Sequence, residues 1–171
     1  HQVSQVSAAR ARPYAAESSR DTLGTLICHK KGSGPKVMFS AHMDSIGLVA
    51  THIDEKGFVR VGALGGVSAK EVAYTPVRFQ NGTCGLICAK DGAEMDKLKV
   101  SDLFVDIGAA DREEAEKLVQ VGDSAVYGTP IRQAAGRVIS PYLDDRIACL
   151  VLLLAMEQLE ETENDLYFVF S

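Results

Sequence analysis

The sequence predicts an α/β fold that carries an inserted β-rich module. Two apolar runs, residues 37–43 and 166–170, are typical of parallel strands that are covered on both faces. A long apolar segment, 143–161, precedes the second run and starts with two aspartates, which suit the N-terminal end of a helix dipole. A helix between two such strands is the pattern of a parallel α/β sheet, with the helix buried against it.

A change of pattern in the middle of the chain sets the predicted domain boundaries. Turn residues become dense after Gly65-Gly66, and the character changes again near Gly136. We therefore assign residues 1–65 and 137–171 to one discontinuous α/β domain, and residues 66–136 to the inserted module.

The first part of the predicted α/β domain contains further strands. Residues 22–30 alternate loosely like a strand, and the Gly-, Ser- and Pro-containing stretch 30–36 indicates a turn. Residues 46–54 and 57–64 are typical of a hairpin. Residues 1–20 show little periodicity and indicate no ordered element.

The inserted module consists mainly of short strand-like pieces separated by turn residues. These pieces are VAYTPVRF, TCGLICA, LFVDIGA and DSAVYG. We expect one helix among them after Asp111. Asp111 can cap it, and Glu114 follows three residues later as in a capping box. We expect a small barrel or a sandwich.

Composition excludes several classes of function. The chain has 171 residues, 46% hydrophobic and 24% charged, which supports a packed core. A net charge of −5 without a basic stripe argues against nucleic acid as a partner. The longest apolar run, Ile147 to Met156, is far shorter than the roughly 20 residues of a membrane span, so we expect no membrane partner.

The cysteines and the first residues indicate the compartment. The four cysteines lack the paired CxxC spacing of a zinc knuckle, so we expect reduced thiols in a cytoplasmic protein. The sequence does not start with Met, and its first residues lack the apolar stretch of a signal peptide. We expect a processed or partial chain.

His42 and Asp44 are the first candidate site residues. They follow the strand at 37–43, and the carboxyl ends of parallel strands are where open α/β sheets place their sites. Two residues apart on an extended chain, their side chains point the same way. An imidazole could then bind a metal while the carboxylate holds its other nitrogen. The alternative is a polar strand end with a locally hydrogen-bonded histidine.

Asp144, Asp145 and Arg146 form the second candidate group. The adjacent carboxylates could bridge metal ions, or they could cap the helix that follows. From these residues alone, capping is the better interpretation. His29 and His52 lie beside turns and are expected at the surface.

Three longer stretches carry a resemblance to a known family. They are KVMFSAHMDSIGLVATHIDEKGFVRVGALGG, LFVDIGAADREEAEKLVQVGD and YLDDRIA, in this order, and DTLGTLICHKKGSGPK precedes the first. Together, over residues 21–171, they resemble the glutamyl and deblocking aminopeptidases, which include the tetrahedral aminopeptidases. The resemblance implies a zinc-peptidase-like α/β domain with an inserted PDZ-like module that serves dimerisation and assembly.

The resemblance also implies a site and an activity. Two divalent metal ions, Zn or Co, would activate water to remove N-terminal residues from short peptides. His42 would be a ligand of one ion, Asp144 would bridge both, and Asp44 would orient the His42 ring. Asp145 would keep its role as a helix cap or as support.

This sequence departs from the family pattern at its C-terminal end. In the family, the strand matching 166–170 leads into a Glu-Glu pair that supplies the general base and another ligand, and this sequence stops at Ser171. We therefore expect an incomplete portion that is inactive alone, within a protein that forms dimers and dodecamers. The alternatives are a non-catalytic assembly or interaction fragment, or a member of the kind labelled endoglucanase.

Overall fold

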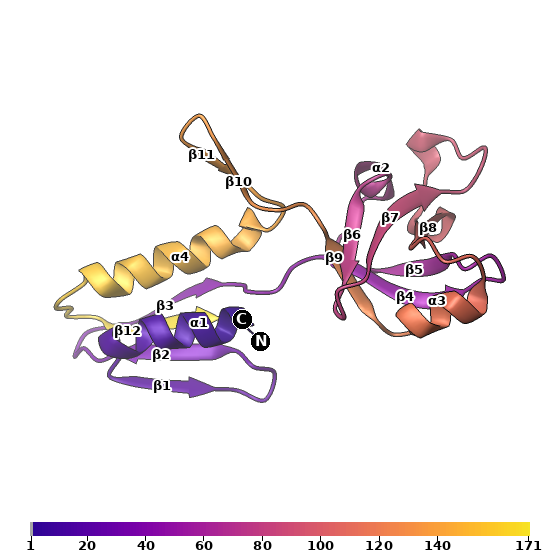
Figure 1. Cartoon of the computed structure of the whole chain (residues 1–171). Helices are drawn as coiled ribbons and strands as arrows, with labels where there is room; N and C mark the ends of the chain where they lie inside the picture. Colours follow the sequence, from indigo (N-terminus) through magenta and orange to yellow (C-terminus); the bar gives the residue numbers. More distant parts are fainter. Residues whose placement is uncertain (1) are drawn as a thin grey trace. The chain divides into compact units, whose positions relative to one another are not determined.

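The computed structural model describes residues 2–171, which fall into two compact units (Figure 1). The first unit contains the chain up to Ser45 together with Tyr142–Ser171, and the second is Ile46–Pro141. Each unit has a hydrophobic core of its own.

The first unit is a four-stranded sheet with two helices. Its strands run in the order β1 (Glu17–Arg20), β2 (Leu26–Lys30), β12 (Asp165–Phe170) and β3 (Lys36–Ala41). Its helices are α1 (Gln2–Ala11), which continues into the 3-10 turn η1 (Arg12–Tyr14), and α4 (Leu143–Gln158). β12 is parallel to β3 and antiparallel to β2. The helix between two parallel strands confirms the predicted α/β fold.

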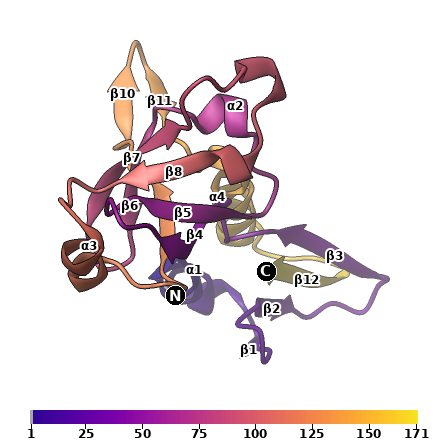
Figure 2. The ribbon, with the colours of Figure 1, turned by 90° about the vertical axis from the view of Figure 1, so that its right-hand side faces the viewer.

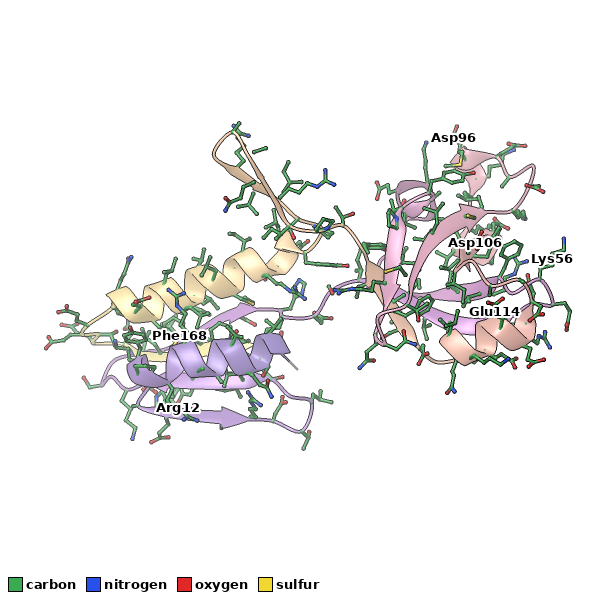
Figure 3. All side chains as sticks on the ribbon, in the orientation of Figure 1. Arg12, Lys56, Asp96, Asp106, Glu114 and Phe168 are labelled. Atoms are coloured by element: carbon green, nitrogen blue, oxygen red, sulfur yellow. The ribbon has the colours of Figure 1, made fainter. Side chains whose placement is uncertain are left out.

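Alternate residues of β12 build the core of this unit. Leu166, Phe168 and Phe170 are buried, and the residues between them are partly exposed, as the two-residue period of a strand requires. Phe168 (labelled in Figure 3) stacks on Phe39 of the neighbouring strand with ring centroids 5.5 Å apart. α4 adds the buried stripe Cys149, Leu153 and Met156 to the same cluster.

The expectation that β3 is covered on both faces is wrong for the described residues, whereas α4 is buried against the sheet, as predicted, through one stripe of side chains. Met38 of β3 is 68% exposed and Val151 of α4 is 56% exposed. β3 is the last strand of the sheet, so one of its edges has no neighbouring strand among residues 2–171. α4 packs through one stripe only, and it ends at Gln158 instead of 161.

Residues 2–11, for which the sequence indicated no ordered element, form helix α1. Its buried positions include Ser4, Ser7 and Ala11. Small and polar residues on the packed face leave no apolar stripe, so the usual helical periodicity is absent from the sequence.

The second unit is a closed six-stranded barrel in the order β4-β5-β8-β7-β6-β9. Its strands are β4 (Gly47–Ile53), β5 (Val59–Leu64), β6 (Pro76–Phe79), β7 (Cys84–Ala89), β8 (Leu103–Asp106) and β9 (Ser124–Tyr127). The short helices are α2 (Ala69–Val72) and α3 (Arg112–Leu118), with 3-10 turns η2 (Met95–Lys97) and η3 (Val100–Asp102). A separate hairpin pairs β10 (Arg132–Ala134) with β11 (Arg137–Ile139). Figure 2 shows β5 and β8 side by side in the barrel wall.

The observed units differ from the predicted domain boundaries. The hairpin β4–β5, which the sequence placed in the α/β domain, belongs to the barrel because β4 pairs with β9 and β5 pairs with β8. Its inward residues Leu48, Ala50, Val59 and Val61 are buried in the barrel core. The division therefore falls after Ser45 and after Pro141, rather than after residues 65 and 136. The cap predicted at Asp111 is present, since its carboxylate accepts from the backbone N–H of Glu114.

Candidate metal centre

His42, Asp44 and Asp144 come together at the carboxyl end of β3. β3 ends at Ala41, so His42 is the first residue after the strand, and Asp144 lies at the start of α4. The neighbouring strand holds this point in place. Met43 donates its backbone N–H to the carbonyl of Ser171 (2.5 Å), and Ser171 donates to the carbonyl of Ala41 (3.0 Å).

Both nitrogens of the His42 ring face carboxylates. Nδ1 lies 2.9 Å from Oδ1 of Asp44, and Nε2 lies 3.3 Å from Oδ1 of Asp144. The His42 side chain is 47% exposed and that of Asp144 is 94% exposed. The group is therefore open to solvent and to ions.

The arrangement fits a divalent cation. The hydrogen bond to Asp44 assigns the imidazole proton to Nδ1, which leaves a lone pair on Nε2. That lone pair faces a carboxylate oxygen of Asp144, and two acceptors at this distance repel each other unless a proton or a cation lies between them. A neutral imidazole with carboxylate oxygens is a donor set that first-row divalent ions accept.

The same carboxylates act on the acid–base equilibrium of His42. Desolvation alone would lower its pKa, but the hydrogen bond that His42 donates to Asp44 and the charges of Asp44, Asp145 and Asp144 together raise the pKa above the ordinary 6.5. A proton therefore competes with a cation for Nε2.

Asp145 and Cys149 also contact His42, and the sequence did not indicate either contact. The backbone N–H of His42 donates to Oδ2 of Asp145 (3.3 Å), and the Cys149 thiol donates to the His42 carbonyl (3.3 Å). The helix cap favoured for the aspartates is not seen, since the capping position is Tyr142 and it makes no side-chain capping bond. Asp144 and Asp145 have non-helical backbone angles and are joined by a cis peptide bond. The only signal in the sequence is the four-residue spacing of Asp145 and Cys149, which puts both on one face of a helix.

The described residues do not form a complete metal centre. Within residues 2–171, no group of three or more His, Cys, Asp or Glu side chains has the geometry to hold a metal ion. In the same part of the chain, the ion pairs of the His42, Asp44 and Asp144 side chains involve no glutamate.

His29 differs from the expectation of a surface residue. Its Nε2 lies 2.6 Å from Asp165, and its side chain is mostly buried. The ring also stacks on Tyr167, with centroids 4.4 Å apart. His29 and Asp165 join β2 to the start of β12, whereas His42 follows the end of the parallel strand β3. His52 is exposed, as expected, and lies 3.4 Å from the guanidinium of Arg112.

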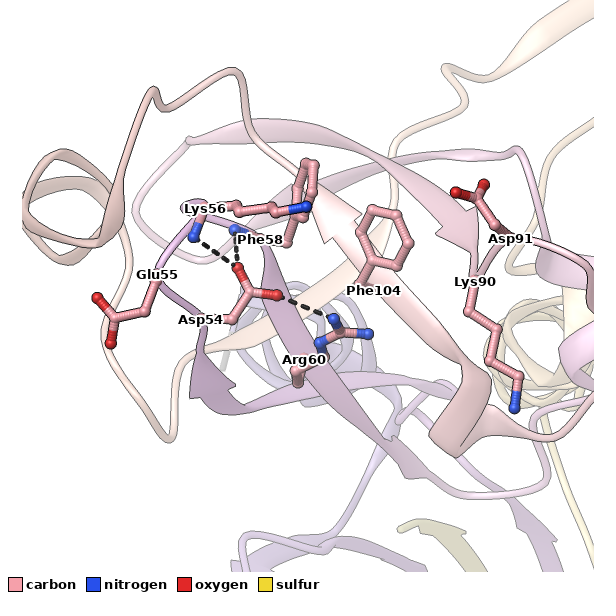
Figure 4. Close-up of a pocket in the computed structure, with 8 residues that line it drawn as sticks. All are labelled: Asp54, Glu55, Lys56, Phe58, Arg60, Lys90, Asp91 and Phe104. Carbon is pink, nitrogen blue, oxygen red and sulfur yellow. Dashed lines mark hydrogen bonds and ion pairs between the residues drawn. The ribbon is translucent and has the colours of Figure 1, made fainter.

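The barrel has a shallow hollow of about 420 Å³, drawn in Figure 4. Phe58 and Phe104 form its apolar base, and the Arg60 guanidinium lies over the Phe104 ring. Asp54 accepts from Arg60 and from the backbone N–H groups of Lys56 and Phe58. The charges of Asp54 and Arg60 therefore neutralise each other. The residues that line the hollow include no hydroxyl or thiol nucleophile and no set of metal ligands like the one at His42.

Comparison with known proteins identifies related sequences. The model of the family described as M42 glutamyl aminopeptidase matches residues 24–171. A protein of Acetivibrio thermocellus named "Putative aminopeptidase" is 45% identical over 152 residues, which are 88% of this chain and 46% of that protein. A lysyl aminopeptidase of Pyrococcus furiosus is 39% identical over 176 residues, which cover 94% of this chain and 50% of the length of that protein. The chain thus spans about half the length of these curated relatives.

Solved structures match the fold over nearly the whole chain. An aminopeptidase from Desulfurococcus kamchatkensis has a TM-score of 0.89 and 32% identity, covering 99% of this chain and 50% of that chain. The Pyrococcus horikoshii TET1 peptidase, described as assembling into a tetrahedron or a large octahedral shell, has a TM-score of 0.80 and 31% identity. The match covers 98% of this chain and 54% of that chain. A Thermotoga maritima protein described as an endoglucanase has a TM-score of 0.84 and 29% identity, over 99% of this chain and 53% of that chain. No helix among residues 2–171 is long and apolar enough to cross a membrane.

Proposed function

The chain belongs to the M42 glutamyl aminopeptidase family, and we propose that it supplies part of the dinuclear metal centre of an aminopeptidase. The proposed reaction removes N-terminal residues from short peptides. The observation that carries the proposal is the His42 ring between two carboxylates, with the Nε2 lone pair directed at Asp144.

Each of the three predicted residues has a role in this proposal. Asp44 holds the proton of His42 on Nδ1, so that Nε2 is free to bind a cation. Asp144 has two carboxylate oxygens, which could each contact a different ion. Two divalent ions, Zn or Co, would polarise the scissile carbonyl and activate a water molecule when bound.

The other parts of the site would come from residues outside those described. Three or four protein ligands per ion are usual for zinc, and the described residues supply fewer. The relatives are about twice as long, so we propose that the corresponding half supplies the remaining ligands and the glutamate general base. Residues 1–171 alone are then expected to show no peptidase activity.

The barrel is proposed to serve assembly. The finer assignments, a PDZ-like module for dimerisation and a zinc-peptidase-like first unit, rest on the family resemblance. The matched TET1 peptidase is described as forming large shells, which supports a homo-oligomer for the protein that contains this chain. We also propose a cytoplasmic location, which rests on the unpaired spacing of the four cysteines in the sequence.

A metal titration of the 171-residue chain tests the proposal. Calorimetry with ZnCl₂ or CoCl₂ should show one weak site that is lost in His42→Ala and Asp144→Ala. His52→Ala is the matched control, because His52 is an exposed histidine in the barrel. Binding that survives His42→Ala, or that His52→Ala abolishes, would contradict the assignment.

An activity assay separates the proposed function from the endoglucanase label of one matched structure. The longest form that the gene encodes should hydrolyse aminoacyl anilides, lose activity with a chelator and leave cellulose intact. Glycoside hydrolysis normally uses two carboxylic groups without a metal, so chelator-resistant cleavage of cellulose would favour the label. A form with neither activity would favour the assembly fragment.

A further inference from the structure

We propose that Asp145 and Cys149 are positioning residues that hold the backbone N–H and C=O groups of His42, so that its Nε2 faces Asp144. The inference rests on the proposed function, since the position matters only if His42 binds a cation. Neither residue is placed among the ligands. Their effect passes through the backbone of His42.

Asp145 binds the backbone N–H of His42. Its Oδ2 accepts from the His42 backbone N–H at 3.3 Å, across 103 residues of sequence. A hydrogen bond to a charged acceptor is stronger than one between neutral groups. The preceding residue, Asp144, meanwhile faces the His42 ring. Adjacent carboxylates thus contact the backbone and the side chain of one residue.

Cys149 binds the backbone carbonyl of His42. It is 3% exposed and lies four residues after Asp145, within α4. Its Sγ lies 3.3 Å from the His42 carbonyl oxygen, and since a carbonyl can only accept, the thiol is the donor. The first turns of α4 therefore engage both polar groups of the His42 main chain.

The surroundings of His42 explain why its backbone needs this support. The sheet bonds next to it belong to Ala41 and Met43, which pair with Ser171 on either side. The polar main-chain groups of His42 are bonded to α4 instead. The ring is half exposed, so packing does not fix it; its position depends on the hydrogen bond to Asp44 and on the backbone from which it projects.

Hydrogen exchange and ring signals in the metal-free 171-residue chain test the inference directly. In Asp145→Ala, the His42 amide should exchange about 10-fold faster, the change expected from losing a bond to a charged group. Asp145→Asn keeps a carbonyl oxygen as acceptor and should stay within about 3-fold of wild type. Cys149→Ala should shift the ring ¹⁵N signals of His42, and Cys149→Ser, which retains a donor, should restore them.

The matched control is Cys88→Ala in the barrel, which removes a thiol lying 3.7 Å from the Leu86 carbonyl. It should leave all His42 signals unchanged. Unchanged His42 exchange in a folded Asp145→Ala chain, or identical ring signals in Cys149→Ala and wild type, would overturn the proposal. If the alanine variants unfold, Asp145→Asn and Cys149→Ser must still give wild-type His42 signals, and their failure to do so refutes it.

Zinc titration then separates this inference from the proposed function. With ZnCl₂ as the probe, Asp145→Ala should weaken binding about 10-fold, as outer supports of metal ligands commonly do, and Cys149→Ala about 3-fold. If the wild-type chain bound no zinc while the metal-free signals behaved as expected, the proposed function would fail and the positioning would stand. If zinc bound equally well to wild type and all four variants, the positioning would fail and the metal site would stand.

Discussion

Replacing Gly32 with alanine should destabilise the first unit, because the turn between β2 and β3 touches another loop at this residue. A Cβ atom on Gly32 would lie 2.2 Å from the carbonyl oxygen of Asn164 and 2.6 Å from that of Glu163. Both contacts are with backbone, so no side-chain rotation relieves them. The turn must move away from the loop that leads into β12.

The size of the effect follows from what that movement breaks. Overpacking by one methyl group costs about 1–3 kcal/mol. The movement also strains two bonds, one from Gly34 to the Glu163 carbonyl (2.5 Å) and one from the Gly32 amide to Asp165 (3.3 Å). Hydrogen bonds contribute about 1 kcal/mol each. We expect a loss of about 2–4 kcal/mol in the free energy of unfolding.

Urea denaturation followed by the amide signals of β12 measures the first unit alone, since the two units have separate cores. Gly66→Ala is the control for adding a Cβ where there is room, and it is followed by the amide signals of β5 because Gly66 lies in the barrel unit. Gly66 has no positive φ and no atom within 4 Å of the added Cβ. It should change stability by less than about 1 kcal/mol. A Gly32→Ala chain as stable as Gly66→Ala would refute the close approach of the two loops.

Three further predictions concern Asp44, Asp165 and the two faces of α4. Asp44→Ala should weaken zinc binding about 10-fold by freeing the imidazole that it orients. The hydrogen bond from His29, more than any other contact, lowers the pKa of Asp165 below its ordinary 3.8. The stability from Asp165 is therefore present above that value and lost as pH falls through the lower folded pKa, so Asp165→Asn should flatten the decline of stability below about pH 4. Leu153→Ala should cost about 2–5 kcal/mol, whereas exposed Val151→Ala should cost under about 1 kcal/mol.

Each of these has a clear contrary result. Calorimetry showing equal zinc affinity in Asp44→Ala and wild type would contradict the orienting role. Parallel pH–stability curves for wild type and Asp165→Asn would mean that this carboxylate is not perturbed by folding. Similar losses for Leu153→Ala and Val151→Ala in urea titrations would mean that the two faces of α4 are equally buried.

The candidate site was predictable from sequence in part. His42 and Asp44 follow an apolar run at a spacing that places both side chains on one side, and the structure brings them within 2.9 Å. Asp144 was indicated by the family resemblance, not by its own neighbours, which favoured a helix cap. The contact of Asp145 with the His42 amide could not be read from sequence, because helix caps and long-range acceptors use the same residue type.

The sequence by itself determined the strand–helix–strand core and the turn residues, because these depend on local periodicity and on the preferences of Gly, Ser and Pro. Only the tertiary structure decided which sheet each strand joins. A hairpin pattern says that one face of β4 and β5 is buried, and it does not say that β8 and β9 cover it. The turn at Gly32 was likewise recognisable from composition, and its need for glycine was not. That need comes from the backbone of Asn164, which lies against it only in the folded chain.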